Sequence, residues 1–177
     1  MVVLTPFLFI SVLLFAQSSS PVPEYRVKAT FLYQFTQFVD WPRGAFPSDQ
    51  TPLVIGILGD DPFGTFLDET VRDEKANAHS VVIQRYRNID EVKECQILFV
   101  SRLQAGRIRE IGAALKGRYI LTVGDADGFA ERGGVIEFVT QENRIRLRIN
   151  LGAAKAANLT ISSKLLRPAT VIDQGAR

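Results

Sequence analysis

The sequence predicts an α/β protein with a mostly parallel sheet and flanking helices. Between residues 52 and 125, short continuous apolar runs alternate with helical segments, and such runs are typical of strands buried on both faces of a parallel sheet. An N-terminal amphipathic helix precedes these runs, and a C-terminal β-hairpin and helix follow them. Apolar residues make up 46% of the 177 and charged residues 23%, which is a globular composition.

The first residues have the composition of a secretory leader. The apolar block from Phe7 to Ala16 is too short to span a bilayer as a helix, and small residues follow it. We therefore predict a signal peptide at residues 1–18, cleaved at about 16–20, although no Lys or Arg precedes the block. An uncleaved membrane anchor is the alternative. Residues 24–172 are expected to form a single domain.

Residues 24–42 predict a helix that packs against the sheet. Pro42 ends it, because the residue before a proline is pushed out of the α region. The apolar side chains that recur at spacings of three and four, and therefore share one face, are Val27, Phe31, Phe35 and Phe38.

The next elements alternate in the order that a parallel sheet requires. We predict strands at residues 52–59, 79–86, 95–101 and 118–125, and helices at 61–74 and 105–117. Gly117 stands at the C-cap position of the second of these helices. The side chains expected on that helix's buried face are Ile108, Ile111 and Leu115.

Residues 133–151 then change to strict alternation around Gln141-Glu142-Asn143, which predicts a β-hairpin. The second arm places three isoleucine or leucine side chains on one face and three arginines on the other. The arginine row either binds an acidic partner or only protects the hairpin from aggregation. The arginines of this row are Arg144, Arg146 and Arg148.

Residues 151–169 predict a helix with a break near residues 158–160, ended by Pro168.

The turn LGDDPFG lies between a predicted strand and a predicted helix and contains glycines, as phosphate-binding turns do, but it lacks the sequence motifs of such turns. The glycines at positions 56, 59 and 64 have neither the dinucleotide-binding nor the P-loop spacing. Asp61 is a preferred N-cap residue and Pro62 suits the first helical position, so the pair predicts a helix start. Asp61 would then accept the N–H groups that a phosphate needs, and its negative charge would repel an anion.

A ligand cleft is expected where the carboxyl ends of parallel strands meet. Asp60 follows the first predicted strand and Asp125 ends the fourth, and we assign Phe129 to the same cleft. Acids so placed can exchange protons or hold a hard cation. Turn formation and helix capping are the alternative roles for these acids.

The sequence contains no obvious catalytic or metal-binding cluster. His79 is the only histidine and Cys95 the only cysteine, so we predict no metal site and no cofactor. His79 lies in a polar turn and is expected to be solvated. Cys95 opens an apolar strand and is expected to be a buried, inert thiol, with an intermolecular disulfide as the alternative. The net charge of +2 gives no indication of nucleic-acid binding.

Trp41 and Phe46 flank the loop after the first helix and are the best candidates for exposed aromatic anchors. Aromatic side chains of this kind are enriched in protein–protein interfaces. The alternative is that Trp41 folds back and closes the core.

Four blocks of the chain together resemble the YfiR family, in the family's order, from about Glu24 to Val171. They are VKATFLYQFTQFVDWP, PLVIGILGDDPFG, CQILFVS and ILTVGDADGFAERGGVIEFVTQENRIRLRINLGAAKAANLTISSKLLRPA. The specific features are F-V-x-W-P, L-G-D-D-P-F-G, G-F-A-x-x-G-G and I-S-S-K-L-L in combination.

The resemblance implies a small periplasmic regulatory protein without catalytic activity. Such a protein represses an inner-membrane diguanylate cyclase by binding the cyclase's periplasmic sensory domain, and so tunes cyclic di-GMP signalling and biofilm formation. The resemblance also implies a homodimer and an outer-membrane lipoprotein that sequesters the repressor. A small-ligand binding module that serves a sensor histidine kinase is the alternative. The cysteine pairs of the best-understood members are missing here, so intrachain redox control is not carried over.

Overall fold

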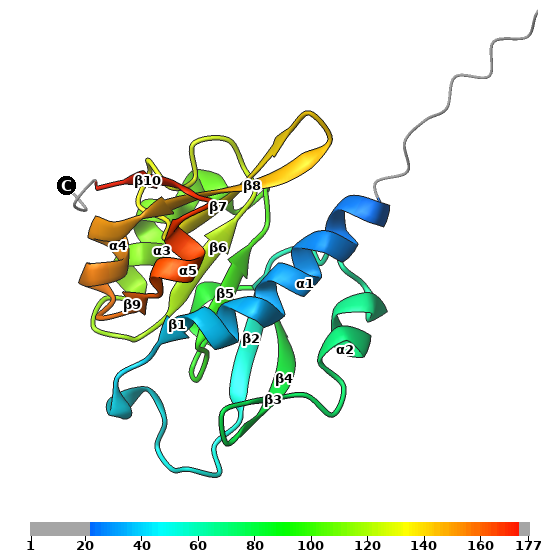
Figure 1. Cartoon of the computed structure of the whole chain (residues 1–177). Helices are drawn as coiled ribbons and strands as arrows, with labels where there is room; N and C mark the ends of the chain where they lie inside the picture. Colours follow the sequence, from blue (N-terminus) through cyan, green and yellow to red (C-terminus); the bar gives the residue numbers. More distant parts are fainter. Residues whose placement is uncertain (1–21, 174–177) are drawn as a thin grey trace, which may run out of the picture.

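Eight strands form one curled sheet in the computed structural model, which describes residues 22–173 (Figure 1). The predicted signal peptide at residues 1–18 lies outside the described residues. The strands of the large sheet are β2 (Leu53–Leu58), β3 (Lys75–Ala76), β4 (His79–Tyr86), β5 (Ile97–Val100), β6 (Leu121–Gly124), β7 (Ile136–Gln141), β8 (Arg144–Asn150) and β10 (Thr170–Ile172). The helices are α1 (Val22–Phe38), α2 (Thr65–Val71), α3 (Ile108–Ala114), α4 (Leu151–Ala156) and α5 (Ser163–Leu166).

The sheet is mostly parallel, as predicted. Its strand order is β10-β8-β7-β6-β5-β2-β4-β3. The five strands β4, β2, β5, β6 and β7 are parallel to one another, and β3 pairs with β4 in the antiparallel direction. The β7–β8 hairpin is antiparallel and turns through Glu142 and Asn143, both at positive φ, as a two-residue hairpin turn requires. A separate antiparallel pair joins β1 (Val39–Asp40) to β9 (Thr160–Ile161).

The core lies on both faces of the central strands. All six residues of β2 are buried. Alternate side chains of β2 face opposite ways, so Ile55 and Ile57 join the cluster under α1, while Val54 and Leu58 join the cluster under α3. The predicted buried face of α3 is confirmed at Ile108, Ile111 and Leu115.

The buried face of α1 is rotated from the predicted one. Phe35 is buried as expected, but Val27 is 45% exposed, and Lys28 next to it is 0% exposed. The spacing of apolar residues could not show this, because Lys28 is buried through an ion pair with a distant residue. The helix also ends at Phe38, before Pro42, since the next two residues pair with β9.

The helix predicted at residues 61–74 is shorter and begins at Thr65. The prediction that Asp61 caps this helix is wrong, because the N-cap position of α2 is Gly64; the Asp61 side chain accepts the N–H groups of Phe63 (2.7 Å) and Gly64 (3.2 Å) in the turn before the helix. Gly64 at φ 57 interrupts the path into the helix, so Pro62 lies before α2 and not at its first position.

The C-terminal segment divides into four short elements. The break predicted near residues 158–160 is present, with Asn158 at φ 55. It separates α4 from α5 and contains β9, while Thr170–Ile172 adds β10 to the sheet in parallel with β8. Both strands are only two or three residues long, too short for an alternation pattern to predict.

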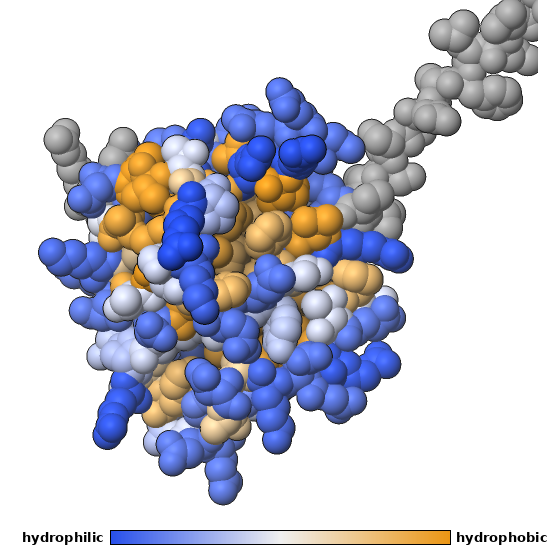
Figure 2. Space-filling view, in the orientation of Figure 1, coloured by the Kyte–Doolittle hydropathy of each residue, from blue (hydrophilic) through white to orange (hydrophobic). Residues whose placement is uncertain are grey.

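None of the helices in residues 22–173 is long and apolar enough to cross a membrane. On the face shown in Figure 2, hydrophilic side chains predominate, and apolar residues appear in separate areas near β10 and the first turns of α1.

Candidate functional site

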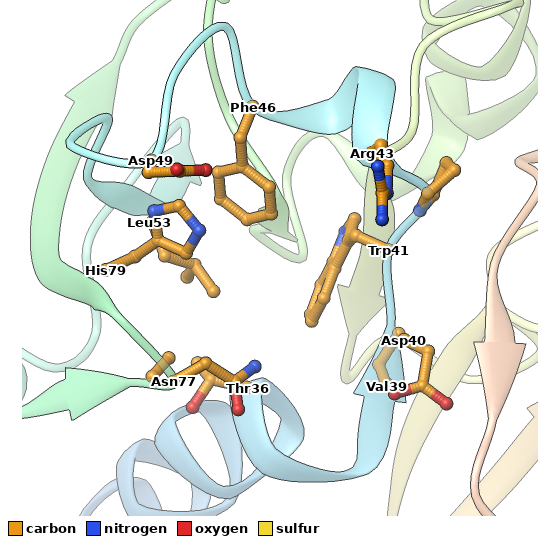
Figure 3. A pocket seen from close by; sticks show the side chains of 12 residues that line it. Thr36, Val39, Asp40, Trp41, Arg43, Phe46, Asp49, Leu53, Asn77 and His79 are labelled. Atoms are coloured by element: carbon orange, nitrogen blue, oxygen red, sulfur yellow. The ribbon is translucent and has the colours of Figure 1, made fainter.

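A pocket of about 550 Å³ opens where the chain leaves α1 (Figure 3). We call it the Trp41 pocket, after the side chain that forms one wall. The end of α1, the segment after it, and the β3–β4 connection together surround it, which explains why no single stretch of sequence reveals it. The residues that line it include Trp41, Arg43, Phe46, Asp49 and His79.

Aromatic rings form two opposite walls of the Trp41 pocket. The Phe46 and His79 rings are stacked, with centroids 4.0 Å apart and planes at 9°. His79 Nδ1 lies 2.6 Å from the Thr51 carbonyl oxygen, which fixes the imidazole against Phe46. Trp41 lies across the cavity from this stack (Figure 3). The indole N–H of Trp41 makes no hydrogen bond with any residue in the described part of the chain.

Charged side chains stand around these rings. Arg43 and Asp49 are exposed, while Trp41 and Phe46 are half-buried. An aromatic centre with a charged rim is the usual arrangement of a protein–protein contact. The structure therefore brings together the two aromatic residues proposed from the sequence and adds Arg43 and His79. His79 was expected to be solvated but is packed on Phe46, a contact between segments that sequence periodicity does not report.

The arginine row lies elsewhere. No hairpin residue lines the Trp41 pocket, and the hairpin meets α1 at the opposite end of the helix, where Thr140 donates to Glu24 (Figure 1). A helix of 17 residues separates the two regions by about 25 Å.

The three arginines of the row also differ in how exposed they are. Arg144 and Arg146 are exposed. Arg148 is half-buried and pairs with Glu131 (3.0 Å) and Glu137 (3.2 Å), so its charge is already engaged within the protein.

A second, smaller cavity of about 130 Å³ lies at the carboxyl ends of three adjacent strands. Asp60 follows β2, Ser101 follows β5 and Asp125 follows β6, and all three line this strand-end cavity. Tyr25 from α1 and Phe99 from β5 contribute aromatic walls. Asp60 and Asp125 thus meet at one edge of the sheet, as the strand pattern suggested.

Phe129 does not belong to this cavity. It is fully buried in the cluster on the α3 side of the sheet. The turn after Asp125 folds the ring back against Gly124 and Gly134, where an added Cβ would lie 2.6 and 2.1 Å from ring carbons. The sequence placed Phe129 near Asp125 along the chain but could not show this reversal of direction.

Asp125 is held by groups from α1. Lys28 Nζ lies 2.6 Å from one Asp125 oxygen and 2.6 Å from Glu24, and Tyr25 donates to the same Asp125 oxygen at 2.9 Å. Burial of Tyr25, together with the nearby Asp125 charge, raises the pKa of the Tyr25 hydroxyl to about 12. The helix thus fixes the carboxylate in a buried position at the end of β6.

The turn that begins with Asp61 has no free anion site at the two amides that donate to Asp61. Asp61 accepts two backbone N–H groups and also pairs with Arg85 at 2.7 Å. Arg85 binds Asp68 as well, at 2.5 Å, and hydrogen bonding to Arg85 lowers the pKa of the Asp68 carboxyl. Residues 22–173 also contain no group of three or more His, Cys, Asp or Glu residues that could hold a metal ion.

A family model described as YfiR/HmsC-like matches residues 25–170. A search of curated proteins finds no match. Among solved structures, a protein described as the ABC domain in complex with L-Trp from Streptococcus pneumonia is similar, with 13% identity and a TM-score of 0.55. A conserved domain protein from Vibrio cholerae has 17% identity and a TM-score of 0.46. The matches cover 81% and 67% of this chain but only 60% and 54% of those chains, and at these identities the first likeness shows the fold alone.

Proposed function

The chain belongs to the YfiR/HmsC-like family, and from that premise we propose that it is a non-enzymatic regulatory protein of the periplasm. Its target is the periplasmic sensory domain of an inner-membrane diguanylate cyclase. By binding that domain it represses the cyclase, and so lowers cyclic di-GMP and biofilm formation. The export signal at residues 1–18, a homodimeric state and sequestration by an outer-membrane lipoprotein belong to the same proposal.

The Trp41 pocket is the observation that supports a docking role. Its aromatic side chains are half-buried and surround a cavity of about 550 Å³ instead of filling it. The indole N–H of Trp41 is itself buried and unpaired within what the structure describes, so a partner would meet the indole ring and not its N–H group. Tryptophan is among the residues most often responsible for affinity at the centre of an interface. Arg43 and Asp49 at the rim can fix the orientation of a charged partner.

Repression follows from a difference in affinity. A protein that binds the inactive form of a sensory domain more tightly than the active form shifts the sensor toward inactivity. No covalent chemistry is needed, and a second protein that competes for the repressor releases the sensor. The size of the effect is set by the ratio of the two affinities, so loss of a contact made only to the inactive form weakens regulation.

Complementation of a strain that lacks the gene tests this function. Deletion is expected to raise cyclic di-GMP, and the unaltered gene to restore the original level. Trp41→Ala and Phe46→Ala should fail to restore it, because truncation of a central aromatic anchor typically weakens binding by about 30-fold or more. Phe66→Ala is the matched control, since Phe66 is a half-buried aromatic on α2 outside the pocket.

Co-purification of the cyclase from a detergent extract should follow the same order among the variants. An unchanged cyclic di-GMP level on deletion, or full repression by Trp41→Ala, would contradict the proposal. The strand-end cavity supports the second candidate, a small-ligand binding module that serves a sensor histidine kinase. A ligand that stabilises the purified protein in thermal unfolding would favour that candidate.

A further inference from the structure

Two buried oxygen atoms at the strand-end cavity make no hydrogen bond with any residue of the described chain. They are Asp125 Oδ1 and Ser101 Oγ, on side chains of residues that are 2% and 4% exposed. Buried polar atoms are nearly always hydrogen-bonded, because leaving one unpaired is costly. Both residues line the cavity, so a group bound there can supply the missing donors.

The arrangement of acceptors corresponds to a primary ammonium group. Ser101 stands on the middle strand of three, between Asp60 and Asp125 on the neighbouring strands. Three oxygen-bearing side chains therefore converge on one small space from three strand ends. A primary ammonium carries three N–H donors and no acceptor. Gly59 leaves space beside the buried hydroxyl, because a Cβ at that position would lie 2.4 Å from Ser101 Oγ.

The charges around the cavity also favour a monovalent cation. The carboxylates of Glu24, Asp60 and Asp125 outnumber the two cations, Lys28 and Arg102, by one. Arg102 approaches Asp125 Oδ1 only to 3.5 Å, and its side chain is 58% exposed, so solvent weakens that interaction. An anion would meet two carboxylates in the cavity. A divalent metal ion would lie beside Lys28, which already occupies the other Asp125 oxygen.

We propose that the strand-end cavity binds the ammonium group of a small primary amine. The ammonium is held by Asp125 Oδ1, Ser101 Oγ and Asp60, and the short carbon chain packs on Tyr25 and Phe99. The volume of about 130 Å³ corresponds to about four water molecules, so it accommodates the ammonium group and a short carbon chain such as that of ethanolamine or propylamine. This proposal deepens the ligand-binding role named above as the second candidate, and it is independent of docking at the Trp41 pocket.

Binding is measured by NMR titration of the purified protein with ethanolamine and propylamine at neutral pH. Both amines are protonated there. We expect saturable shifts of the backbone amides of Tyr25, Ser101 and Asp125. Tetramethylammonium has the same charge without N–H donors, and 1-propanol has a similar chain without the charge. Neither control should produce these shifts. No saturation by either amine, or equal binding of tetramethylammonium, would overturn the proposal and leave water as the occupant.

Variants identify the acceptors. Ser101→Ala removes a hydroxyl that makes no hydrogen bond in the described chain, so the fold should be kept, while amine affinity should fall about tenfold. Asp60→Asn should weaken binding to a similar degree. Asp127→Asn, an exposed carboxylate outside the cavity, should leave affinity unchanged. Asp125→Asn should abolish binding if it folds. Unchanged affinity in Ser101→Ala would refute the site whatever Asp125→Asn does.

Discussion

Lys28 and Asp125 form a buried ion pair between the first helix and the end of β6. The Lys28 Nζ atom lies 2.6 Å from Asp125 Oδ2, and the two side chains are 0% and 1% exposed. Glu24 on the preceding turn of α1 binds the same ammonium at 2.6 Å, and the Tyr25 ring lies under it at 4.4 Å. The pair thus joins segments 97 residues apart and fixes α1 over the strand-end cavity.

Lys28→Met should destabilise the protein by about 3–5 kcal/mol, because it leaves the Asp125 carboxylate buried without its main cation. Urea unfolding followed by circular dichroism measures the change. Lys155→Met is the matched control, since Lys155 is exposed on α4 and its loss should change stability by less than about 0.5 kcal/mol.

The double variant Lys28→Met/Asp125→Leu should recover part of that loss, because apolar replacement of both partners removes the unpaired charge. Equal stability of Lys28→Met and the unaltered protein would show that the pair does not contribute as inferred.

Sequence periodicity was sufficient for the central part of the fold and insufficient for α1. The apolar runs of β2 and β5 are short and alternate with helical segments, which is typical of strands buried on both faces, so the parallel sheet followed from them. In α1 the same reasoning assigned Val27 to the buried face and ignored Lys28. A lysine is buried only when a partner is present, and that partner, Asp125, is remote in the sequence.

Gly124→Ala should destabilise the protein by about 1–3 kcal/mol. A Cβ at Gly124 would lie 2.6 Å from the Phe129 ring, which is fully enclosed and has no space to move. Gly112→Ala is the control: Gly112 lies within α3 with nothing within 4 Å of the added atom. That substitution should stabilise the protein by about 0.5–1 kcal/mol through helix propensity. Thermal unfolding of both variants distinguishes them.

The interpretation of Phe129 can be checked by combining substitutions. If the clash with the ring causes the loss, Gly124→Ala/Phe129→Leu should be less destabilised than the sum of the two single variants. Strict additivity would indicate that the ring and the glycine are not in contact.

The Cys95 thiol should be unreactive in the folded protein and contribute to a loss of stability in alkali. Burial raises its pKa to about 12, so in the folded state it keeps its proton when an unfolded chain has already lost it. Stability is therefore intact below the ordinary thiol pKa of about 9 and falls as the pH rises from there toward 12. Between pH 9 and 10 the thiol should account for about 1 kcal/mol of the loss.

Cys95→Ala isolates this contribution, because its stability should fall less steeply over the same interval. The measurement is confined to pH 9–10 because two tyrosines would add to the loss at higher pH. Tyr25 and Tyr86 also have pKa values raised to about 12, and ordinary tyrosines begin to titrate near 10. Iodoacetamide at pH 8 should modify Cys95 only after unfolding. Rapid modification of the native protein would contradict burial of the thiol.

The candidate sites were predictable only in part. Asp60 and Asp125 were found because strand ends in a parallel sheet converge, which is a rule of topology. Ser101 stands at an equivalent strand end, but a serine there carries no signal of its own. Tyr25 and His79 reach their cavities from other elements through contacts that no local pattern encodes.

The three arginines of the hairpin should differ sharply in what they do. Arg148 forms an ion pair with Glu137, which is only 3% exposed. The carboxylate of Glu137 also accepts the N–H groups of Gly128 and Ala130. Arg148→Ala removes the cation beside this buried carboxylate and should destabilise the protein by about 1–3 kcal/mol in urea unfolding.

Arg144→Ala and Arg146→Ala remove exposed charges and should change stability by less than about 0.5 kcal/mol. If these two residues contact an acidic surface of the proposed partner, each substitution should weaken binding at low salt and lose most of its effect at high salt, because screening already reduces such contacts there. Binding to the sensory domain at two salt concentrations measures this. The opposite result, a destabilised Arg144→Ala variant and an Arg148→Ala variant of unchanged stability, would contradict these roles. Arg144, and not Arg148, would then be the arginine whose charge stabilises the fold.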